Sequence, residues 1–200
     1  MNRMFKFALG LTVGGAVLVG CNNMNHDMHD HSTTMKSMMQ NAGKVAVAEL
    51  KPSKNATTQP SNNNVTGTVT FTETGGKVHV TAHVMGLAPN SEHGFHIHAS
   101  GDISAPDLMS TGGHFNPTNH IHGGPTTSPV HAGDLGNLKA DDKGMAMLDL
   151  TVDDISIGTG SANDIVGKAV IVHGAPDDLK SQPAGNAGPR VAGGVIELKK

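Results

Sequence analysis

The chain has 200 residues, and its 14 basic and 17 acidic side chains leave a formal net charge of −3 when histidine is neutral. This balance provides no basic surface for a phosphate backbone, so nucleic acid is not an expected partner. Aromatic residues make up 2% of the chain, so the core has to be built from Val, Ile, Leu, Ala and Met. The length suits one domain of about 150 residues with a tail.

The first 20 residues have the pattern of a secretory signal peptide. Arg3 and Lys6 precede an apolar run that ends in Leu-Val-Gly immediately before Cys21. The run is shorter than the roughly 20 residues that cross a bilayer, and polar Asn22 follows it, so a transmembrane helix is the weaker interpretation. We expect residues 1–20 to be removed and Cys21 to be lipidated, the alternative being a free thiol. Cys21 is the only cysteine, which excludes an intramolecular disulfide.

This leader predicts a protein of the cell envelope, in the periplasm and anchored to a membrane by lipid. Asn22 after Cys21 favours the outer membrane if the host is Gram-negative. Residues 21–43 are rich in His and Met and have no apolar periodicity, which predicts a disordered tether. Two roles for it stay open. It is either a plain spacer or a segment that captures Cu(I) or Zn(II) through thioethers and imidazoles.

From residue 44 onward, apolar residues recur at every second position, as in strands with one buried and one wet face. We predict strands at residues 44–51, 65–72, 78–84, 146–152, 169–173 and 192–198. The second and third form a hairpin through the turn Thr74-Gly75-Gly76. The core shows no capped amphipathic helix. Many short strands punctuated by Gly, Pro and Asn predict an all-β sandwich or barrel over residues 44–200.

Two segments interrupt this rhythm, at residues 99–133 and 174–190. Both are much longer than the connections of about 4 to 6 residues that usually join strands. Long loops on a rigid β scaffold are where binding and catalytic groups are expected. The unusual residues of the chain do collect in and beside these two segments.

Histidine pairs on strands are the first candidate ligands. His96 and His98 are two residues apart, so on a strand both imidazoles project from the same face and reach one metal ion. The similar pair His79 and His83 is interpreted as a wet strand face. His173 ends a short apolar strand that can return beside His96 and His98.

The loop after His98 supplies a second candidate set: His114, His122, His131 and Asp134. Three imidazoles and a carboxylate complete a closed tetrahedral zinc site. Together with Gly133-Asp134-Leu135-Gly136-Asn137 and Gly185-Asn186-Ala187-Gly188-Pro189-Arg190, these motifs resemble the copper/zinc superoxide dismutases. The resemblance runs from about Val65 to the C-terminus, and its separated motifs occur in the order of that family.

The resemblance implies a Greek-key β-barrel of about eight antiparallel strands that holds two metals. It assigns copper to His96, His98, His114 and His173, and zinc to His114, His122, His131 and Asp134. His114 would then bridge both metals as an imidazolate. Asp177 matches the carboxylate that accepts hydrogen bonds from one histidine of each site. Arg190 matches the guanidinium that draws in the superoxide anion and orients it.

The function implied is conversion of superoxide to dioxygen and hydrogen peroxide by copper redox cycling, which protects the cell envelope from oxidative damage. Arg190 and His114 would have the catalytic roles. A homodimer is left open, because dimer surfaces differ between branches of the family. His120 competes with His122 as zinc ligand, and His122 is preferred because Gly-Gly-Pro follows it. His93 is interpreted as a surface histidine.

The largest departure from the family concerns its internal disulfide. The two cysteine positions are occupied here by Leu108 and Gly193. A covalent link that contributes about 2 to 4 kcal/mol is therefore missing. We expect Leu108 to anchor the metal loop by packing instead.

Two rival hypotheses remain. The first is a periplasmic lipoprotein that stores or delivers copper and zinc without catalysis. A complete set of copper ligands together with Arg190 argues against it, because a store needs no guiding arginine. The second is an inert sandwich stabilised by zinc, which leaves His96, His98 and His173 unexplained.

Overall fold

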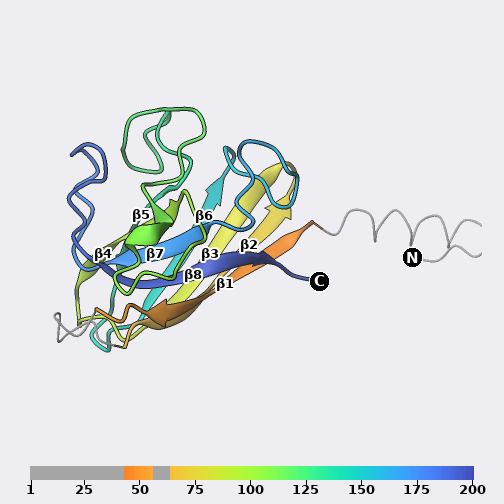
Figure 1. The fold of residues 1–200 in the computed structure, drawn as a ribbon. Coiled ribbons are helices and arrows are strands. Elements are labelled where there is room, and N and C mark those ends of the chain that lie inside the picture. The colour runs from red at the N-terminus through yellow and green to blue at the C-terminus, as the bar shows by residue number, and fades with distance from the viewer. Residues whose placement is uncertain (1–42, 56–63) are drawn as a thin grey trace, which may run out of the picture. The chain divides into compact units, whose positions relative to one another are not determined.

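The computed structural model describes residues 43–55 and 64–200 (Figure 1). The predicted signal peptide, the predicted lipidation at Cys21 and the predicted tether up to residue 42 lie outside the described residues. The domain boundary at residue 44 therefore stays a prediction. Within the described part of the chain, no helix is long and apolar enough to cross a membrane.

The described residues form eight strands, which confirms the all-β prediction. They are β1 (Val45–Pro52), β2 (Thr66–Thr74), β3 (Lys77–Met85), β4 (Glu92–His98), β5 (Asp134–Lys139), β6 (Ala146–Val152), β7 (Ala169–His173) and β8 (Arg190–Leu198). One short 3₁₀ helix, η3 (Met109–Thr111), lies in the long loop after β4. The sequence did not single out β4 and β5 as strands by alternation, because both are buried along most of their length.

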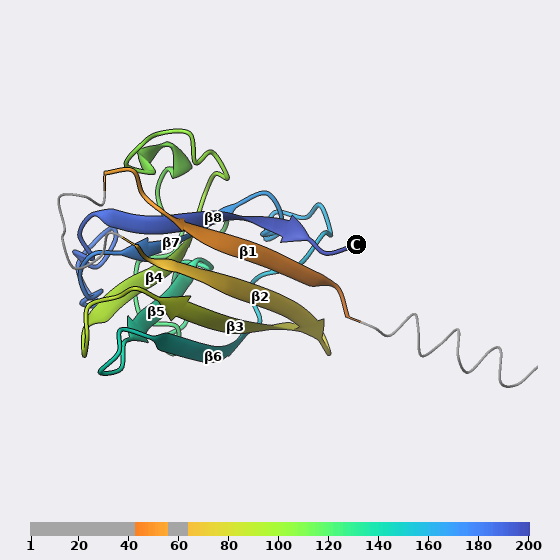
Figure 2. The same cartoon turned by 90° about the horizontal axis from the view of Figure 1, so that it is seen from below.

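The strands form one antiparallel sheet in the order β5-β4-β7-β8-β1-β2-β3-β6. The edge strands β5 and β6 approach each other, so the sheet curls into a nearly closed barrel (Figures 1 and 2). β2 and β3 pair over their full length around Gly75 and Gly76, as the predicted hairpin requires. Both glycines have positive φ, 59° and 79°, the left-handed conformation that glycine adopts without steric cost.

The inward faces of the strands build one aliphatic core around Phe71 and Phe95, both fully buried. Burying a Val, Leu, Ile or Phe side chain stabilises the fold by roughly 1.5 to 3 kcal/mol each. The alternation expected for β3 is seen, with positions 78, 80, 82 and 84 buried. The alternation Ala192, Gly194, Ile196 and Leu198 predicts an inward Leu198, but the structure leaves it 45% exposed. It ends β8 beside Gly158, which has no side chain to cover it.

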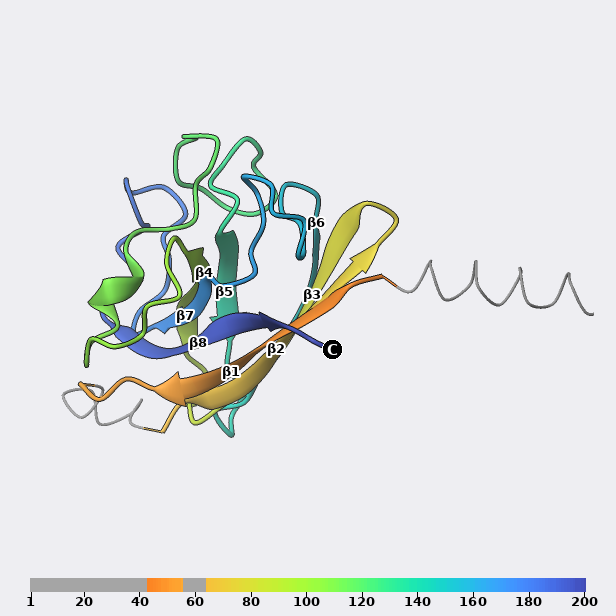
Figure 3. The same cartoon turned by 45° about the vertical axis from the view of Figure 1, so that its right-hand side comes forward.

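Strands β4 and β7 depart from alternation, since β4 is buried from His93 onward and β7 is buried throughout. The segments 99–133 and 174–190 cover their outer side (Figures 1 and 3). Backbone hydrogen bonds fix this arrangement: Ile97 N–H donates to Gly133 O at 2.9 Å, and Gly94 N–H donates to Ala175 O at 2.9 Å. The outer face of β4 thus becomes the floor of a site beneath the two loops.

Candidate metal centre

Strand β4 holds the first two ligand candidates, His96 and His98, whose exposed fractions are 0% and 1%. His173 ends β7, which pairs with β4, and a bridge between His98 and His114 brings the loop histidine to the same place. The β4 to β5 ladder is shifted between Gly94 and His96, and such irregularities redirect side chains beside functional sites. The ligand nitrogens of this group lie within 4.8 Å of one another: His96, His98, His114 and His173.

The second group adjoins the first and shares His114 with it. Asp134 begins β5 opposite His96, and its carboxylate meets three loop imidazoles. Its ligand atoms also lie within 4.8 Å of one another: His114, His122, His131 and Asp134. His114 uses Nδ1 toward Asp134 Oδ1, at 2.7 Å, which leaves Nε2 for the first group.

Hydrogen bonds determine which nitrogen carries the proton in the first group. Nδ1 of His98 lies 2.9 Å from Gly112 O, and Nδ1 of His173 lies 3.1 Å from Gly188 O. A carbonyl only accepts, so Nδ1 is the protonated atom in both rings. Burial lowers the pKa of both histidines, that of His173 to about 4, so both are neutral at pH 7. Their bare Nε2 atoms face each other at 3.3 Å.

In the second group, too, atoms with lone pairs face each other. Nε2 of His122 donates to Asp177 Oδ1 at 2.9 Å, which leaves Nδ1 as the nitrogen that can offer a lone pair to a metal. That nitrogen lies 3.0 Å from Asp134 Oδ2 yet has no hydrogen bond. Nδ1 of His131 lies 3.4 Å from Asp134 Oδ1 and is also unpaired. Lone pairs at these separations repel each other unless a cation lies between them.

Burial makes these unpaired nitrogens costly. Four buried imidazole nitrogens lack a hydrogen-bond partner: His96 Nδ1, His114 Nε2, His122 Nδ1 and His131 Nδ1. An unsatisfied buried polar group costs about 1 to 3 kcal/mol. All four belong to the two groups, and a bound metal would satisfy every one. The donor sets fit the two metals, since imidazoles suit copper, and three imidazoles with a carboxylate suit zinc.

The carboxylate of Asp134 is ionised in this setting. Burial alone would raise its pKa, but hydrogen bonds from His114 and from the backbone N–H of Gly123 outweigh that effect and lower the pKa. His131 shows the opposite balance, since burial lowers its pKa although Asp134 acts to raise it. Asp134 therefore supplies the negative charge of the second group, and His131 supplies a neutral imidazole.

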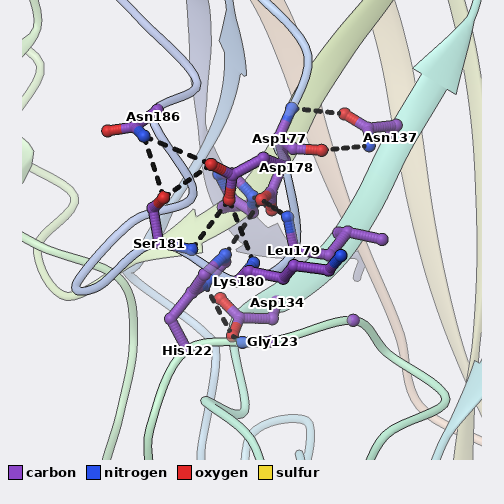
Figure 4. A network of polar contacts seen from close by, with 12 residues as sticks. His122, Gly123, Asp134, Asn137, Asp177, Asp178, Leu179, Lys180, Ser181 and Asn186 are labelled. Carbon is purple, nitrogen blue, oxygen red and sulfur yellow. Dashed lines mark hydrogen bonds and ion pairs between the residues drawn. The ribbon is translucent and has the colours of Figure 1, made fainter.

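Asp177 forms a hydrogen bond with one histidine of each group, and Figure 4 shows it close to His122 and Asn137. Its Oδ2 accepts from His96 Nε2 at 2.8 Å, and its Oδ1 accepts from His122 Nε2 at 2.9 Å. The side chains of all three residues have 0% exposure. One carboxylate thus fixes the tautomer of a ring in each group and turns both Nδ1 atoms toward the ligand positions.

Comparisons with known proteins agree with this geometry. Residues 65–196 match the family model described as copper/zinc superoxide dismutase. The chain belongs to the copper/zinc superoxide dismutase family. A relative named superoxide dismutase [Cu-Zn], from Yarrowia lipolytica, is 46% identical over 145 residues, which cover 68% of this chain and 92% of the relative. The crystal structure of the clock protein EA4 is similar with a TM-score of 0.68 and 39% identity, over 79% of this chain and 96% of that chain.

The family match identifies the chain as an oxidoreductase that dismutates superoxide, with copper and zinc as its cofactors. The predicted family, all-β fold and superoxide dismutase activity are therefore confirmed. The storage protein and the zinc-stabilised sandwich are the weaker hypotheses, since neither accounts for this membership.

The cation expected to guide superoxide is held rigidly in this dismutase. Arg190 begins β8, and its Nη1 donates to Leu108 O and to Thr111 Oγ1, each at 2.7 Å, while Nη2 donates to Gly112 O at 2.6 Å. Gly112 O also accepts from His98 Nδ1. One loop carbonyl therefore links the guanidinium to a ligand of the first group.

The loop between β4 and β5 is anchored without a disulfide. Leu108 is 6% exposed and packs with Ala169 and Ile171 in a small cluster, as the sequence predicted. A Cβ at Gly193 would lie 3.1 Å from Leu108 Cδ1, so the leucine occupies the space beside the glycine. Arg190 adds three hydrogen bonds to the same segment, a contribution that the sequence did not reveal.

Two further histidines lie near the site with different roles. His120 is exposed, and its Nδ1 lies near Thr118 Oγ1 and Val130 O, so the group that could hold a metal ion contains His122 and not His120. The prediction that His93 is a surface residue was wrong, because it is 2% exposed. Its Nδ1 donates to His173 O at 2.8 Å. The sequence prediction missed this because His93 precedes the His96 and His98 motif and had no role assigned to it.

Two amide side chains, whose contacts the sequence did not reveal, support the network. Asn137 makes two hydrogen bonds with the backbone of Asp177, at 2.8 and 2.9 Å (Figure 4). Gln182 binds the backbone N–H and O of His122, at 2.8 and 2.9 Å. The loop 174–190 is thereby tied both to β5 and to the loop that carries the second group. Asn137 lies within the Gly133 to Asn137 motif, so only Gln182 lacked a sequence signal.

Proposed function

We propose that the first group holds copper and that the second holds zinc in this superoxide dismutase. The observation that supports this most strongly is that atoms with lone pairs face each other at two places. These are His98 Nε2 with His173 Nε2, and His122 Nδ1 with Asp134 Oδ2. A metal cation bound between the two atoms of each pair would remove their repulsion. Bound copper supplies the one-electron redox couple needed to convert two superoxide anions and two protons to dioxygen and hydrogen peroxide.

His114 and Arg190 act on the substrate in this proposal. Nε2 of His114 belongs to the copper group and has no hydrogen-bond partner, so in the state in which it does not bind copper it could take up a proton and pass it to the departing peroxide. The Arg190 guanidinium is positively charged and fixed by three hydrogen bonds. It binds the superoxide anion in one orientation and loses little side-chain entropy in doing so.

Metal content of single variants tests the assignment. His98→Ala is expected to lose copper and keep zinc, His122→Ala to lose zinc and keep copper, and His114→Ala to weaken both. His120→Ala is the matched control, since His120 lies outside the ligand groups, and it is expected to keep both metals. Loss of zinc from His120→Ala with retention in His122→Ala would reverse the assignment.

The proposed place of action is the cell envelope, where the enzyme removes superoxide before it damages envelope components. Support comes from the leader pattern before Cys21 and from Asn22 after it. Fractionation of cells is expected to find the parent with the membranes, and Cys21→Ser in the soluble periplasmic fraction. Equal distribution of the two proteins would refute a lipid anchor at Cys21.

A homodimer is the last element of the proposal. The support is a cavity of about 320 Å³ over β1 and β8, where Val47, Val195 and the 38% exposed Ile103 lie among the charged residues Glu49, Lys51 and Glu197. Apolar groups around such a depression favour a second copy of the chain. Sedimentation equilibrium is expected to give a dimer for the parent and a monomer for Ile103→Asp. A monomeric parent would refute the dimer and leave the metal assignment intact.

A further inference from the structure

Three methionines and a histidine gather on the outer face of β3 and β6. Met85, Met145 and Met147 are 53%, 48% and 74% exposed, and His83 is exposed as well. We call these four residues the methionine patch. Its members lie on β3 and β6 or directly before β6, whereas the copper and zinc ligands come from β4, β5, β7 and the long loops.

The register of the sheet places the four side chains next to one another. His83 pairs with Met147, and Val84 pairs with Ala146. Met85 and Met145 follow at the next position on each side, and alternation returns both to the outer face. Figure 2 shows β3 and β6 side by side at this edge of the sheet. Directly opposite residues of antiparallel strands have Cβ atoms about 4.5 to 5.5 Å apart, which lets long side chains meet over one point.

Packing does not explain these residues. Among the described residues, eight large hydrophobic side chains are exposed, and three of them are the methionines of the patch. The fourth exposed methionine, Met109, lies in η3 within the loop after β4. A protein surface usually carries such residues singly. Three thioethers on adjacent positions form a local concentration of one donor type.

The histidine of the patch is available for binding. His79 lies on the same face of β3, and its Nε2 is 2.9 Å from Asp149 Oδ1. The side chain of His83, in contrast, has no hydrogen bond or ion pair within the described parts of the chain. The residue opposite it on β6 is Met147, a thioether. Its imidazole can therefore offer a lone pair to a ligand beside Met147.

We propose that the methionine patch is a binding site for Cu(I). Thioether sulfur is a soft donor that selects Cu(I), and imidazole accepts the same ion, whereas hard divalent ions prefer oxygen donors. His83 and Met147 supply the central pair, and Met85 and Met145 complete the donor set. The four members of the patch supply only thioether and imidazole donors, which favour a soft monovalent cation over Ca²⁺ or Mg²⁺. The proposal is independent of the copper and zinc assignment above.

Titration of the full chain already loaded with copper and zinc tests the site, because the buried imidazoles are then occupied. Cu(I) is added without oxygen against a chromogenic Cu(I) chelator. Ag(I), a soft ion without redox chemistry, is added to protein labelled with ¹³C at the methionine methyl groups, and NMR follows each methyl. The resonances of Met85 and Met147, assigned from the Leu variants, report on the patch separately from other methionines of the chain.

The methyl resonances of Met85 and Met147 are expected to move together as Ag(I) is added, while that of Met109 stays in place. The double variant M85L/M147L keeps the apolar area and removes two thioethers, and its Cu(I) stoichiometry is expected to fall by one, or its Kd to rise at least about tenfold. M109L is the matched control and is expected to bind as the parent does. His83→Gln is expected to weaken binding without touching any thioether.

Two results would overturn the proposal. The first is a set of patch methyl resonances that do not respond to Ag(I). The second is an M85L/M147L variant with the parent's Cu(I) stoichiometry and Kd. Urea unfolding of each variant shows that it is folded, and superoxide dismutation by the same samples reports on the main site. A sample that binds Cu(I) at the patch but does not dismutate superoxide would count against the copper and zinc assignment, and it would leave the patch proposal intact.

Discussion

Replacement of Gly185 by alanine tests the Asp177 network quantitatively. A Cβ at this position would lie 1.7 Å from Asp177 Oδ1 and 2.7 Å from His122 Nε2. The backbone of residue 185 cannot easily retreat, because its N–H donates to Ser181 O and its O accepts from Asp178 N–H. The carboxylate of Asp177 must therefore move, and it leaves its hydrogen bonds to His96 and His122 when it does.

The expected loss of stability has two parts. Gly185 has φ +63°, so any side chain costs about 1 to 2 kcal/mol in the left-handed conformation. Displacement of Asp177 breaks two hydrogen bonds to a charged group, and such bonds contribute about 1.5 to 3 kcal/mol each. Gly160→Ala isolates the first part, because Gly160 has φ +70° and nothing within 4 Å of an added Cβ. We expect Gly185→Ala to be less stable than Gly160→Ala by at least about 3 kcal/mol.

Urea unfolding of both variants with a metal chelator present measures this difference. Zinc and copper titrations of the same samples report whether the ligands remain correctly oriented, and Gly185→Ala is expected to bind both metals at least about tenfold more weakly. If the two variants unfold at the same urea concentration and bind metals equally, the structure misplaces Asp177, and its role in orienting the ligands is refuted.

Three further predictions follow from buried groups. The pKa of His173 is lowered to about 4 by burial, from an ordinary value of 6.5. The unfolded chain therefore gains a proton near pH 6.5 and the folded chain near pH 4. The stability of the chelator-treated protein is fully present above pH 6.5 and falls by about 3 kcal/mol toward pH 4 for this residue alone, as urea unfolding would measure. Leu108→Ala is expected to lose about 2 to 5 kcal/mol of unfolding free energy, because Leu108 is 6% exposed. Thr111→Val removes the hydroxyl that accepts from Arg190. We expect steady-state kinetics to show a lower kcat/KM, with an activation free-energy loss larger than the loss of unfolding free energy.

Controls sharpen each of these three predictions. The pH trend is contradicted if stability is flat between pH 7 and pH 5. Leu198→Ala is the comparison for Leu108→Ala, since Leu198 is 45% exposed, and equal losses would show that Leu108 does not anchor the loop. Thr111→Ser keeps the hydroxyl and is expected to restore kcat/KM, so its failure to do so would remove Thr111 from the support of Arg190.

The fold was predictable where one side of a strand faces solvent. The alternation around Val78 and Val80, and the Gly75-Gly76 turn, follow directly from period-two patterning. Strands β4 and β5 lack that pattern, because the two long loops bury their outer faces. His93 was expected at the surface because no role was assigned to it, but it is 2% exposed and its Nδ1 donates to His173 O.

The candidate ligands were predictable from their types and spacing, because His96 and His98 share one face of a strand and the other ligands occur in motifs of one family. The contacts that hold them were not predictable. Gln182 binds the backbone of His122 across 60 residues of sequence. Arg190 donates to the carbonyl oxygens of Leu108 and Gly112. Such side chain to backbone bonds depend on how two loops fold against each other, and no local pattern encodes that.

Superoxide dismutation by the purified protein loaded with copper and zinc tests the central claim most directly. The parent is compared with His98→Ala and with free copper at the same concentration. We predict that the parent far exceeds free copper and that His98→Ala loses the activity while it retains zinc. A parent that binds both metals and dismutates superoxide no faster than free copper would contradict the account.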